Sequence, residues 1–174
     1  TVAAERLSRL NNHTVFQVYA EKLTTKNALA IFEDYDFVLD GTDNFGSRYL
    51  VNETCVAAGK PLIAAALTQW EGQISVYDPV RGTPCFACVF PDAPASHLVP
   101  NCAEAGVLGP LPGVIGAMMA VEAVKLLAGA GDLLAGRLLI YDALYAQTRT
   151  IATQPRTDCA VCQGRGLRAD IVAS

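Results

Sequence analysis

The chain has 174 residues, of which 52% are hydrophobic, and a formal net charge of -4 with a pI near 5.1. This length supports one well-buried core and predicts a single domain over residues 1–174. The acidic balance leaves no broad basic surface for a phosphate backbone or an anionic bilayer, so we expect neither a nucleic acid nor a membrane partner. The first residues lack the features of a secretory signal, and we expect a cytoplasmic protein.

The first half of the chain alternates between helical and strand patterns. Helices are expected over residues 1–10, 26–32 and 45–58, and a short β-rich run over residues 15–20. The short apolar runs 36–40 and 61–67 are typical of buried parallel strands. This βαβ order predicts an α/β fold with a Rossmann-like, doubly wound and mostly parallel sheet.

The second half predicts a different kind of pairing. Residues 73–78 alternate polar and apolar side chains, which is typical of a strand with one solvent-facing side and of a mixed or antiparallel sheet. A long, proline-interrupted connection covers residues 91–113, and loops of that length are usually functional or mobile. A helix is then expected over residues 114–127, and strands over residues 138–141 and 148–152.

The most apolar stretch, residues 105–121, is interrupted by Pro110 and Pro112 and followed by Glu122. It is too short and too broken to cross a bilayer, so we interpret it as part of a buried helix. Gly113, Gly116 and other small residues allow close helix approach, which favours a homodimer through this helix. The alternative is that the helix lies under its own sheet.

Two C-x-x-C pairs are the most specific local signal: Cys85 with Cys88, and Cys159 with Cys162. Each pair can present two thiolates to one tetrahedral ion, and four thiolates satisfy Zn²⁺ without an open position for water. The sequence therefore predicts a structural zinc site. The alternative is two separate redox pairs or buried thiols.

A second signal, Asp40-Gly41-Thr42-Asp43-Asn44, follows a predicted parallel strand. Ligands of open α/β sheets bind at such strand ends, and an acidic side chain there can hold Mg²⁺ that bridges nucleotide phosphates. Asp43, with Asp40 and Asn44 beside it, is the candidate. The alternative, which the motif alone favours because caps outnumber metal ligands, is that Asp43 or Asn44 caps the helix beginning at Phe45. Both roles can coexist.

A third signal is Cys102, which lies in the long connection and outside both pairs. A loop thiol can act as a nucleophile, but cysteine is also one of the most frequently buried residues, and His97 is the one neighbouring base. Cys55, inside a predicted helix, is interpreted as core packing.

Together with Glu71-Gly72-Gln73-Ile74 and Gly113-Val114-Ile115-Gly116, these motifs resemble the MoeB, ThiF and HesA adenylyltransferases of molybdopterin and thiamine biosynthesis over nearly the whole chain. The resemblance implies ATP-dependent adenylation of the C-terminal Gly-Gly carboxylate of a ubiquitin-like sulfur-carrier protein, by a twofold dimer. It implies that Asp43 is the Mg-ATP aspartate and that the paired cysteines bind zinc. It also matches Cys102 to a cysteine of sulfur or thioester chemistry in some members.

The sequence departs from that family at one point. Members carry a G-x-G-x-x-G loop, a ribose-binding acid, an arginine and a lysine upstream of the position of Thr1, and none of these occurs here. Because such groups stabilise phosphate charge, we expect residues 1–174 to be a partial adenylyltransferase domain that is inactive alone. The alternative function is a non-catalytic module for carrier binding or dimerisation. A nicotinamide-dependent dehydrogenase is disfavoured, because no hydride-transfer residues are recognisable.

Overall fold

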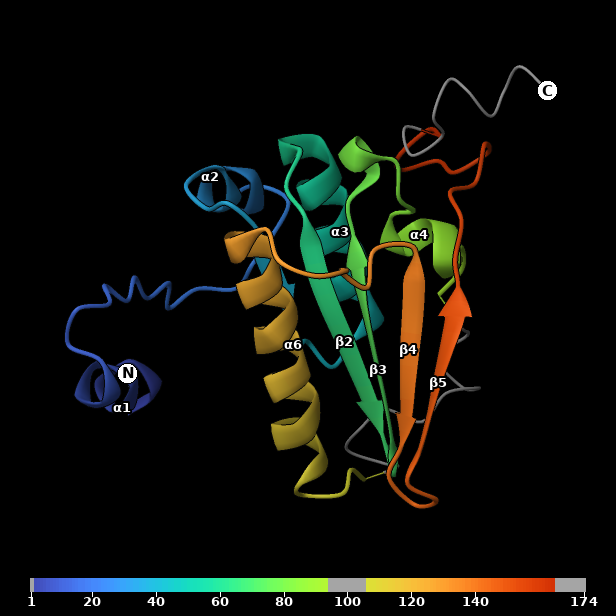
Figure 1. Ribbon diagram of the computed structural model, residues 1–174. Coiled ribbons are helices and arrows are strands. Elements are labelled where there is room, and N and C mark those ends of the chain that lie inside the picture. The colour runs from blue at the N-terminus through green and yellow to red at the C-terminus, as the bar shows by residue number, and fades with distance from the viewer. Residues whose placement is uncertain (1, 94–105, 165–174) are drawn as a thin grey trace.

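A five-stranded sheet forms the centre of the protein in a computed structural model that describes residues 2–93 and 106–164 (Figure 1). The strands follow chain order across the sheet: β1 (Val38–Asp40), β2 (Leu62–Thr68), β3 (Glu71–Tyr77), β4 (Arg137–Asp142) and β5 (Gln147–Ala152). β1 and β2 pair in parallel, and the other three neighbouring pairs are antiparallel. The α/β class and the change to antiparallel pairing are confirmed, but the expectation of a mostly parallel sheet is corrected to a mixed sheet, because one of the four strand pairs in the described residues is parallel.

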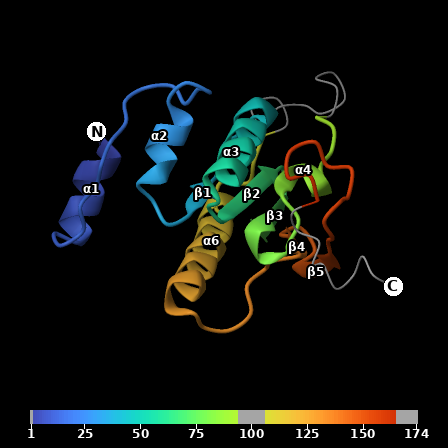
Figure 2. The ribbon, with the colours of Figure 1, turned by 90° about the horizontal axis from the view of Figure 1, so that it is seen from above.

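Helices cover both faces of the sheet (Figures 1 and 2). α3 (Phe45–Ala58) and the short α4 (Phe86–Val89) lie on one face, and α6 (Leu111–Ala128) lies on the other. Successive side chains of β2 alternate between them: Leu62 packs with the cluster that contains α3, whereas Ile63 packs with the cluster that contains α6. The remaining helices are α1 (Val2–Leu10), α2 (Ala28–Glu33) and the 3-10 turn η1 (Pro79–Arg81).

The second half of β3 is buried on both faces, which corrects the expectation of one solvent-facing side there, whereas Glu71 and Gln73 in the first half are half-buried. Ser75 is fully buried although its position in the alternation is polar, and its hydroxyl donates to the carbonyl of Arg137 on β4 at 2.8 Å. Tyr77 on the same face is also buried. In this half of the strand the polar position of the alternation therefore holds a hydrogen-bonded side chain and not one in contact with water.

α3 begins and ends at the residues expected from the sequence. Asn44 is its N-cap, and its side-chain oxygen accepts a hydrogen bond from the backbone N–H of Ser47 at 2.8 Å. Gly59 ends the helix in the left-handed conformation, with φ of 66°, which glycine adopts without steric cost. The helix thus connects the carboxyl end of β1 to the start of β2 in a βαβ unit.

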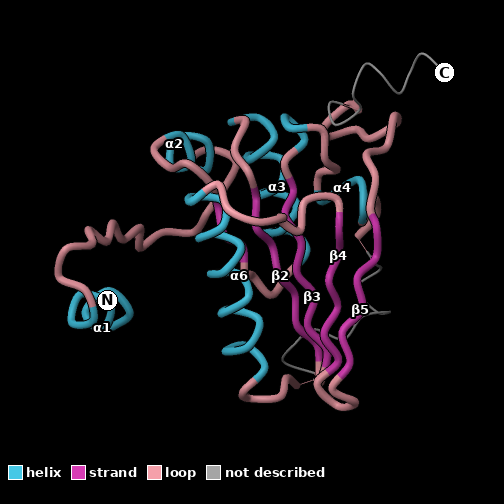
Figure 3. The backbone as a smooth tube through the Cα atoms, viewed as in Figure 1, coloured by secondary structure: helices cyan, strands magenta, loops and turns pink. Residues whose placement is uncertain are grey.

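Two expectations near the helices are wrong. Residues 15–20 form a loop and pair with no strand among the described residues (Figure 3). α1 before them has no buried residue. α6 begins at Leu111 and not at residue 114, because Pro112 lies in the first turn, where the missing N–H of proline costs nothing.

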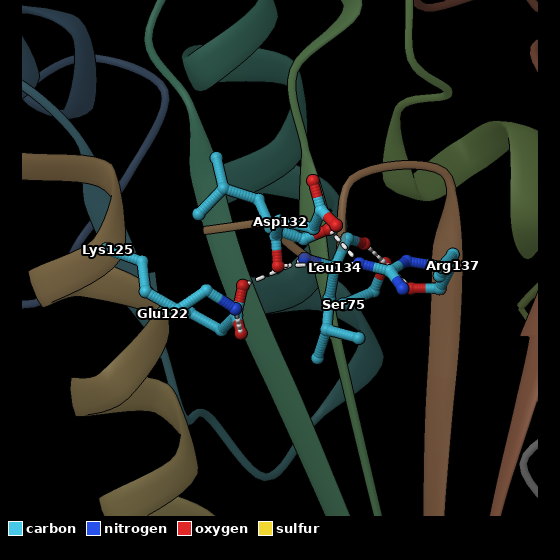
Figure 4. A network of polar contacts seen from close by, with 7 residues as sticks. Ser75, Glu122, Lys125, Asp132, Leu134 and Arg137 are labelled. Atoms are coloured by element: carbon cyan, nitrogen blue, oxygen red, sulfur yellow. Dashed lines mark hydrogen bonds and ion pairs between the residues drawn. The ribbon is translucent and has the colours of Figure 1, made fainter. Parts of the chain in front are cut away.

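α6 is the one helix among the described residues that is long and apolar enough to cross a membrane. Its sheet-facing side carries a buried charge: Glu122 pairs with Lys125 and accepts a hydrogen bond from the backbone N–H of Leu134 (Figure 4). Arg137 on β4 in turn donates to the carbonyl of Leu133. This polar network fixes the connection between α6 and β4 against the sheet. Because 22% of α6 is buried, the expectation of a buried helix holds only for its sheet-facing side.

Candidate metal centre and nucleotide-binding edge

The four cysteines of the C-x-x-C pairs meet in one buried cluster. Cys85 and Cys88 stand at α4, and Cys159 and Cys162 come from the turn after β5. The Sγ atoms of Cys85 lie 3.8 Å from Cys88 and 3.7 Å from Cys159, and those of Cys88 and Cys162 are 3.4 Å apart. A tetrahedron with Zn–S bonds of about 2.3 Å has sulfur–sulfur edges of about 3.8 Å, so the cluster fits one zinc ion.

The backbone around the cluster holds each pair in a tight turn. The N–H of Cys88 donates to the carbonyl of Cys85 at 3.0 Å, and the N–H of Gln163 donates to the carbonyl of Cys159 at 2.8 Å. The sulfur of Cys88 also accepts from the backbone N–H of Arg156 at 3.4 Å. These bonds direct the sulfur atoms of both pairs toward one point.

The protonation of the thiols is set by burial and by local N–H groups. Burial raises the pKa of Cys85, which the neighbouring Cys88 raises further, and burial raises the pKa of Cys162 to about 11. Burial acts on Cys159 in the same direction, but backbone hydrogen bonds from Cys162 and Val161 outweigh it and lower the pKa to about 7. A metal ion must therefore displace protons from Cys85 and Cys162, so its affinity should rise with pH.

The second candidate site lies at the carboxyl end of β1. Asp40 is buried at the end of the strand, and its Oδ1 accepts from the backbone N–H of Thr42 at 2.8 Å. Asp43 is exposed, and its carboxylate accepts a 3.3 Å hydrogen bond from the side chain of Asn44. Because Asn44 is the residue that caps α3, the carboxylate of Asp43 is not occupied by capping.

The same edge contains a buried hydroxyl that is not paired. Among the described residues, Thr42 Oγ1 has no hydrogen-bond partner. Buried polar atoms of this kind usually have a partner, so an unpaired one beside exposed Asp43 is a group that a polar ligand can satisfy. Carboxylate oxygens can bind Mg²⁺, and a hydroxyl can donate a hydrogen bond to a phosphate oxygen.

Arg48 was not singled out in the sequence, and the structure brings it to this edge. Its Nε and Nη2 donate to the carbonyl of Thr42 at 3.1 and 2.8 Å, and its guanidinium lies 5.6 Å from the ring centroid of Phe45. The sequence spacing could have indicated Arg48, because a residue four positions after the cap Asn44 lies on the same side of the helix. Arg48 also borders a hollow on the sheet, lined further by Ala64, Ala65, Ala66, Gln73, Tyr77, Phe86, Phe90 and Leu138.

Cys102 and His97 lie outside the described residues. Cys55 is buried in the core beneath α3, as interpreted from the sequence.

Comparison with known proteins decides the family. The ThiF family pattern matches residues 1–161, which is nearly the entire chain. The chain belongs to the ThiF family. A sulfur carrier protein adenylyltransferase of Thermus thermophilus is 45% identical over 98% of this chain and 65% of its own length. The adenylyltransferase and sulfurtransferase MOCS3 of Xenopus laevis is 45% identical over 91% of this chain and 35% of its own length.

Solved structures agree on the fold. MccB of E. coli superposes with a TM-score of 0.77 at 19% identity, over 96% of this chain and 50% of MccB. MccB with ATP superposes with a TM-score of 0.72 at 16% identity, over 91% of this chain and 49% of MccB. At such identities the likeness establishes the fold alone. This ThiF family chain spans about two thirds of the Thermus relative and about a third of MOCS3.

Proposed function

We propose that this chain is part of an enzyme that uses ATP to adenylate the C-terminal Gly-Gly carboxylate of a ubiquitin-like sulfur-carrier protein. The observation that carries the proposal is the exposed carboxylate of Asp43 at the carboxyl end of β1, in a chain 45% identical to a sulfur carrier protein adenylyltransferase. Ligands of open α/β sheets bind at this edge. The position of Asp43 in the fold and the adenylyltransferase activity named for a relative therefore support the same function.

The chemistry requires that a carboxylate oxygen of the carrier attack the α-phosphorus of ATP while the bond to the β-phosphate breaks and pyrophosphate leaves. Mg²⁺, when bound, neutralises charge on the phosphate oxygens. Asp43 is the residue proposed to hold it, with Asp40 and Asn44 beside it and the hydroxyl of Thr42 within the same edge. Arg48 supplies a fixed positive charge next to these groups.

The phosphate cradle is proposed to come from another part of the protein. The relatives are longer than this chain, and the 174 residues contain no G-x-G-x-x-G loop. Backbone N–H groups of such a loop hold phosphate oxygens, and without them a single edge with Asp43 binds ATP weakly. We therefore propose that residues 1–174 alone are a partial, inactive domain.

The experiment is pyrophosphate exchange. The complete protein should exchange labelled pyrophosphate into ATP when a carrier ending in Gly-Gly is present, and should not do so with a carrier that lacks these glycines. Residues 1–174 alone should show no exchange. If the complete protein binds the carrier without exchange, the non-catalytic binding module is the correct function.

The cysteine cluster supports a structural role for zinc in this enzyme. All four sulfur atoms are buried and lie within 4.8 Å of one another, which leaves no side of the ion open to substrate. Zinc would hold the turn after β5 against α4. Cys102 is proposed, as the resemblance implies, for a later sulfur-transfer or thioester step, so Cys102→Ala should leave pyrophosphate exchange intact in the complete enzyme.

A homodimer is proposed through the outer side of α6. That side exposes apolar side chains spaced by seven, three and three residues, at 38 to 68% of their accessible area: Val114, Val121, Val124 and Leu127. Gly113 and Gly116 have open space around them, which permits close approach of a second helix. A twofold contact would bury the same stripe on both copies.

Light scattering tests the dimer. The zinc-loaded complete protein should be a dimer, and the double variant Val121→Asp, Val124→Asp should be a folded monomer. Val80→Asp, which changes an equally exposed valine on η1, should leave the dimer intact. A wild-type monomer at every concentration would remove the proposal.

A further inference from the structure

We propose that Asn52 on α3 is a positioning residue that connects the cysteine cluster to the helix that begins at the nucleotide-binding edge. Its side chain contacts the first C-x-x-C pair with both of its polar ends: Nδ2 lies 3.9 Å from the sulfur of Cys85, and Oδ1 accepts from the backbone N–H of Phe86 at 2.9 Å. Nothing in the sequence motifs points to this residue. The proposal rests on the zinc site proposed above.

The burial of Asn52 indicates that these contacts are built into the site. Asn52 is 1% exposed, and it lies in α3 among apolar neighbours such as Val51 and Cys55. A buried amide without partners is costly, so a polar side chain is retained at such a position only where its partners are fixed. Here both partners belong to the loop that carries a cysteine pair.

An N–H directed at a metal-bound sulfur has a clear electrostatic effect. Four thiolates around Zn²⁺ carry a net charge of about -2, and donors in the surrounding shell stabilise that charge. Asn52 provides such a donor to Cys85, as the backbone N–H of Arg156 does to Cys88. Neighbours of this kind typically change metal affinity by about 10- to 100-fold.

The helix that carries Asn52 also carries the groups of the nucleotide edge. Asn44, Arg48 and Asn52 are spaced four residues apart along the start and middle of α3. Asn44 caps the helix beside Asp43, and Arg48 donates to the carbonyl of Thr42. One helix thus connects the edge at its first turn to the cysteine pair about two turns later.

A second set of contacts from α3 reinforces this connection. The hydroxyl of Tyr49 donates to the carbonyl of Phe90 at 2.8 Å, and its ring meets Phe86 edge-on with centroids 5.4 Å apart. Phe86 is the first residue of α4 and Phe90 follows its last, and both line the same hollow as Arg48. A metal ion in the cysteine cluster would therefore act on a part of the chain that α3 already contacts through Tyr49 and Asn52.

Cobalt binding by the complete protein tests the proposal. Asn52→Asp keeps the shape and the acceptor for Phe86 but replaces the donor with a negative charge, and Asn52→Leu removes both. Each should bind Co²⁺ about 10- to 100-fold more weakly and shift the sulfur-to-cobalt charge-transfer band. Thr54→Val is the matched control, because Thr54 is buried in the same helix and bonds only to the carbonyl of Leu50 among the described residues.

The outcomes separate the two proposals. If the wild type fails to bind one Co²⁺ through four thiolates, the metal site is wrong. If the wild type binds it and both Asn52 variants match the wild type in affinity and spectrum, the role of Asn52 is wrong. If Asn52→Leu fails to fold, Asn52→Asp decides.

Hydrogen exchange tests the connection to the edge. Chelating the metal from the wild type should raise amide exchange in α4 and in residues 45–52, whereas exchange in α6 should stay unchanged. A zinc-loaded Asn52→Asp variant should already show faster exchange in α4. Unchanged exchange in residues 45–52 after metal removal would show that the metal centre does not hold α3.

Discussion

Gly72 on β3 lies so close to Ile115 on α6 that a Cβ at Gly72 would stand 2.5 Å from Ile115 Cγ1 and 2.6 Å from its Cδ1. Gly72→Ala should therefore lower the free energy of unfolding by about 1–3 kcal/mol, because an extra methyl group in a packed core forces a shift of its neighbours. Urea unfolding of the zinc-loaded protein measures this. Close contact between α6 and β3 thus depends on this glycine.

Gly116→Ala is the control for Gly72. It lies in the same helix as Ile115, but open space surrounds its Cα. Alanine favours a helix interior by about 1 kcal/mol relative to glycine, so this variant should be neutral or more stable when monomeric. Equal destabilisation by both variants would contradict the packing of α6 described above.

Asp43 and Asn44 are adjacent, and their roles should separate by substitution. Asn44→Ala removes the cap of α3 and should cost about 1 kcal/mol of stability. Asp43→Asn should have a free energy of unfolding within about 0.5 kcal/mol of the wild type, because surface substitutions away from caps usually have small effects. The same variant should reduce pyrophosphate exchange in the complete protein by at least about 100-fold. An active Asp43→Asn enzyme would remove Asp43 from the magnesium site.

The metal should contribute much of the stability of the region around α4 and residues 153–164. Cys162→Ser replaces one thiolate and should release the ion and lower the unfolding midpoint. Cys55→Ser changes a buried cysteine that is not in the cluster, and should keep the full metal content. Metal analysis and thermal unfolding measure both effects, and full zinc retention in Cys162→Ser would contradict the four-cysteine site.

Stability should fall at alkaline pH through Cys55. Burial, and then repulsion by Asp40, raises the pKa of this thiol to about 12 in the folded protein, whereas an unfolded thiol ionises near pH 8.5. The thiol of the unfolded state therefore loses its proton first as the pH rises. The contribution of Cys55 to the free energy of unfolding is complete below about pH 8.5 and declines toward about pH 12. Between about pH 8 and about pH 10 the loss should be about 1–2 kcal/mol.

The matched variant isolates this effect. Cys55→Ala should be less stable at neutral pH, because it leaves a small cavity, but should lack the alkaline decline attributed to the thiol. Parallel pH dependences in the wild type and Cys55→Ala, measured by urea unfolding, would show that another group is responsible.

The sequence predicted most elements where periodicity and caps agree. α3 has both an N-cap asparagine and a C-terminal glycine, so its limits could be read directly. The β-rich run predicted at residues 15–20 is no strand, because β-propensity alone does not form a strand without a pairing partner. The predicted start of α6 is wrong because Pro112 is a helix breaker in a helix interior but not in the first turn, which accepts it.

The candidate sites were predictable to different degrees. The cysteine cluster follows from paired spacing, since two residues separated by two others can face one ion. Arg48 and Asn52 have no motif of their own, and their contacts with Thr42 and Cys85 depend on how α3 lies beside the strand and α4. Contacts of that kind come from tertiary packing and cannot be read from local pattern.

Adenylation of the carrier is tested most directly by the intact mass of the carrier protein after reaction with the complete enzyme, ATP and Mg²⁺. Pyrophosphatase is present to draw the reaction forward. The expected product is a carrier that has gained one AMP at its C-terminal glycine. No such product is expected when the terminal Gly-Gly is deleted or when Asp43→Asn replaces the wild type. A complete, zinc-loaded enzyme that binds the carrier and ATP but never yields the AMP adduct would contradict the proposed function.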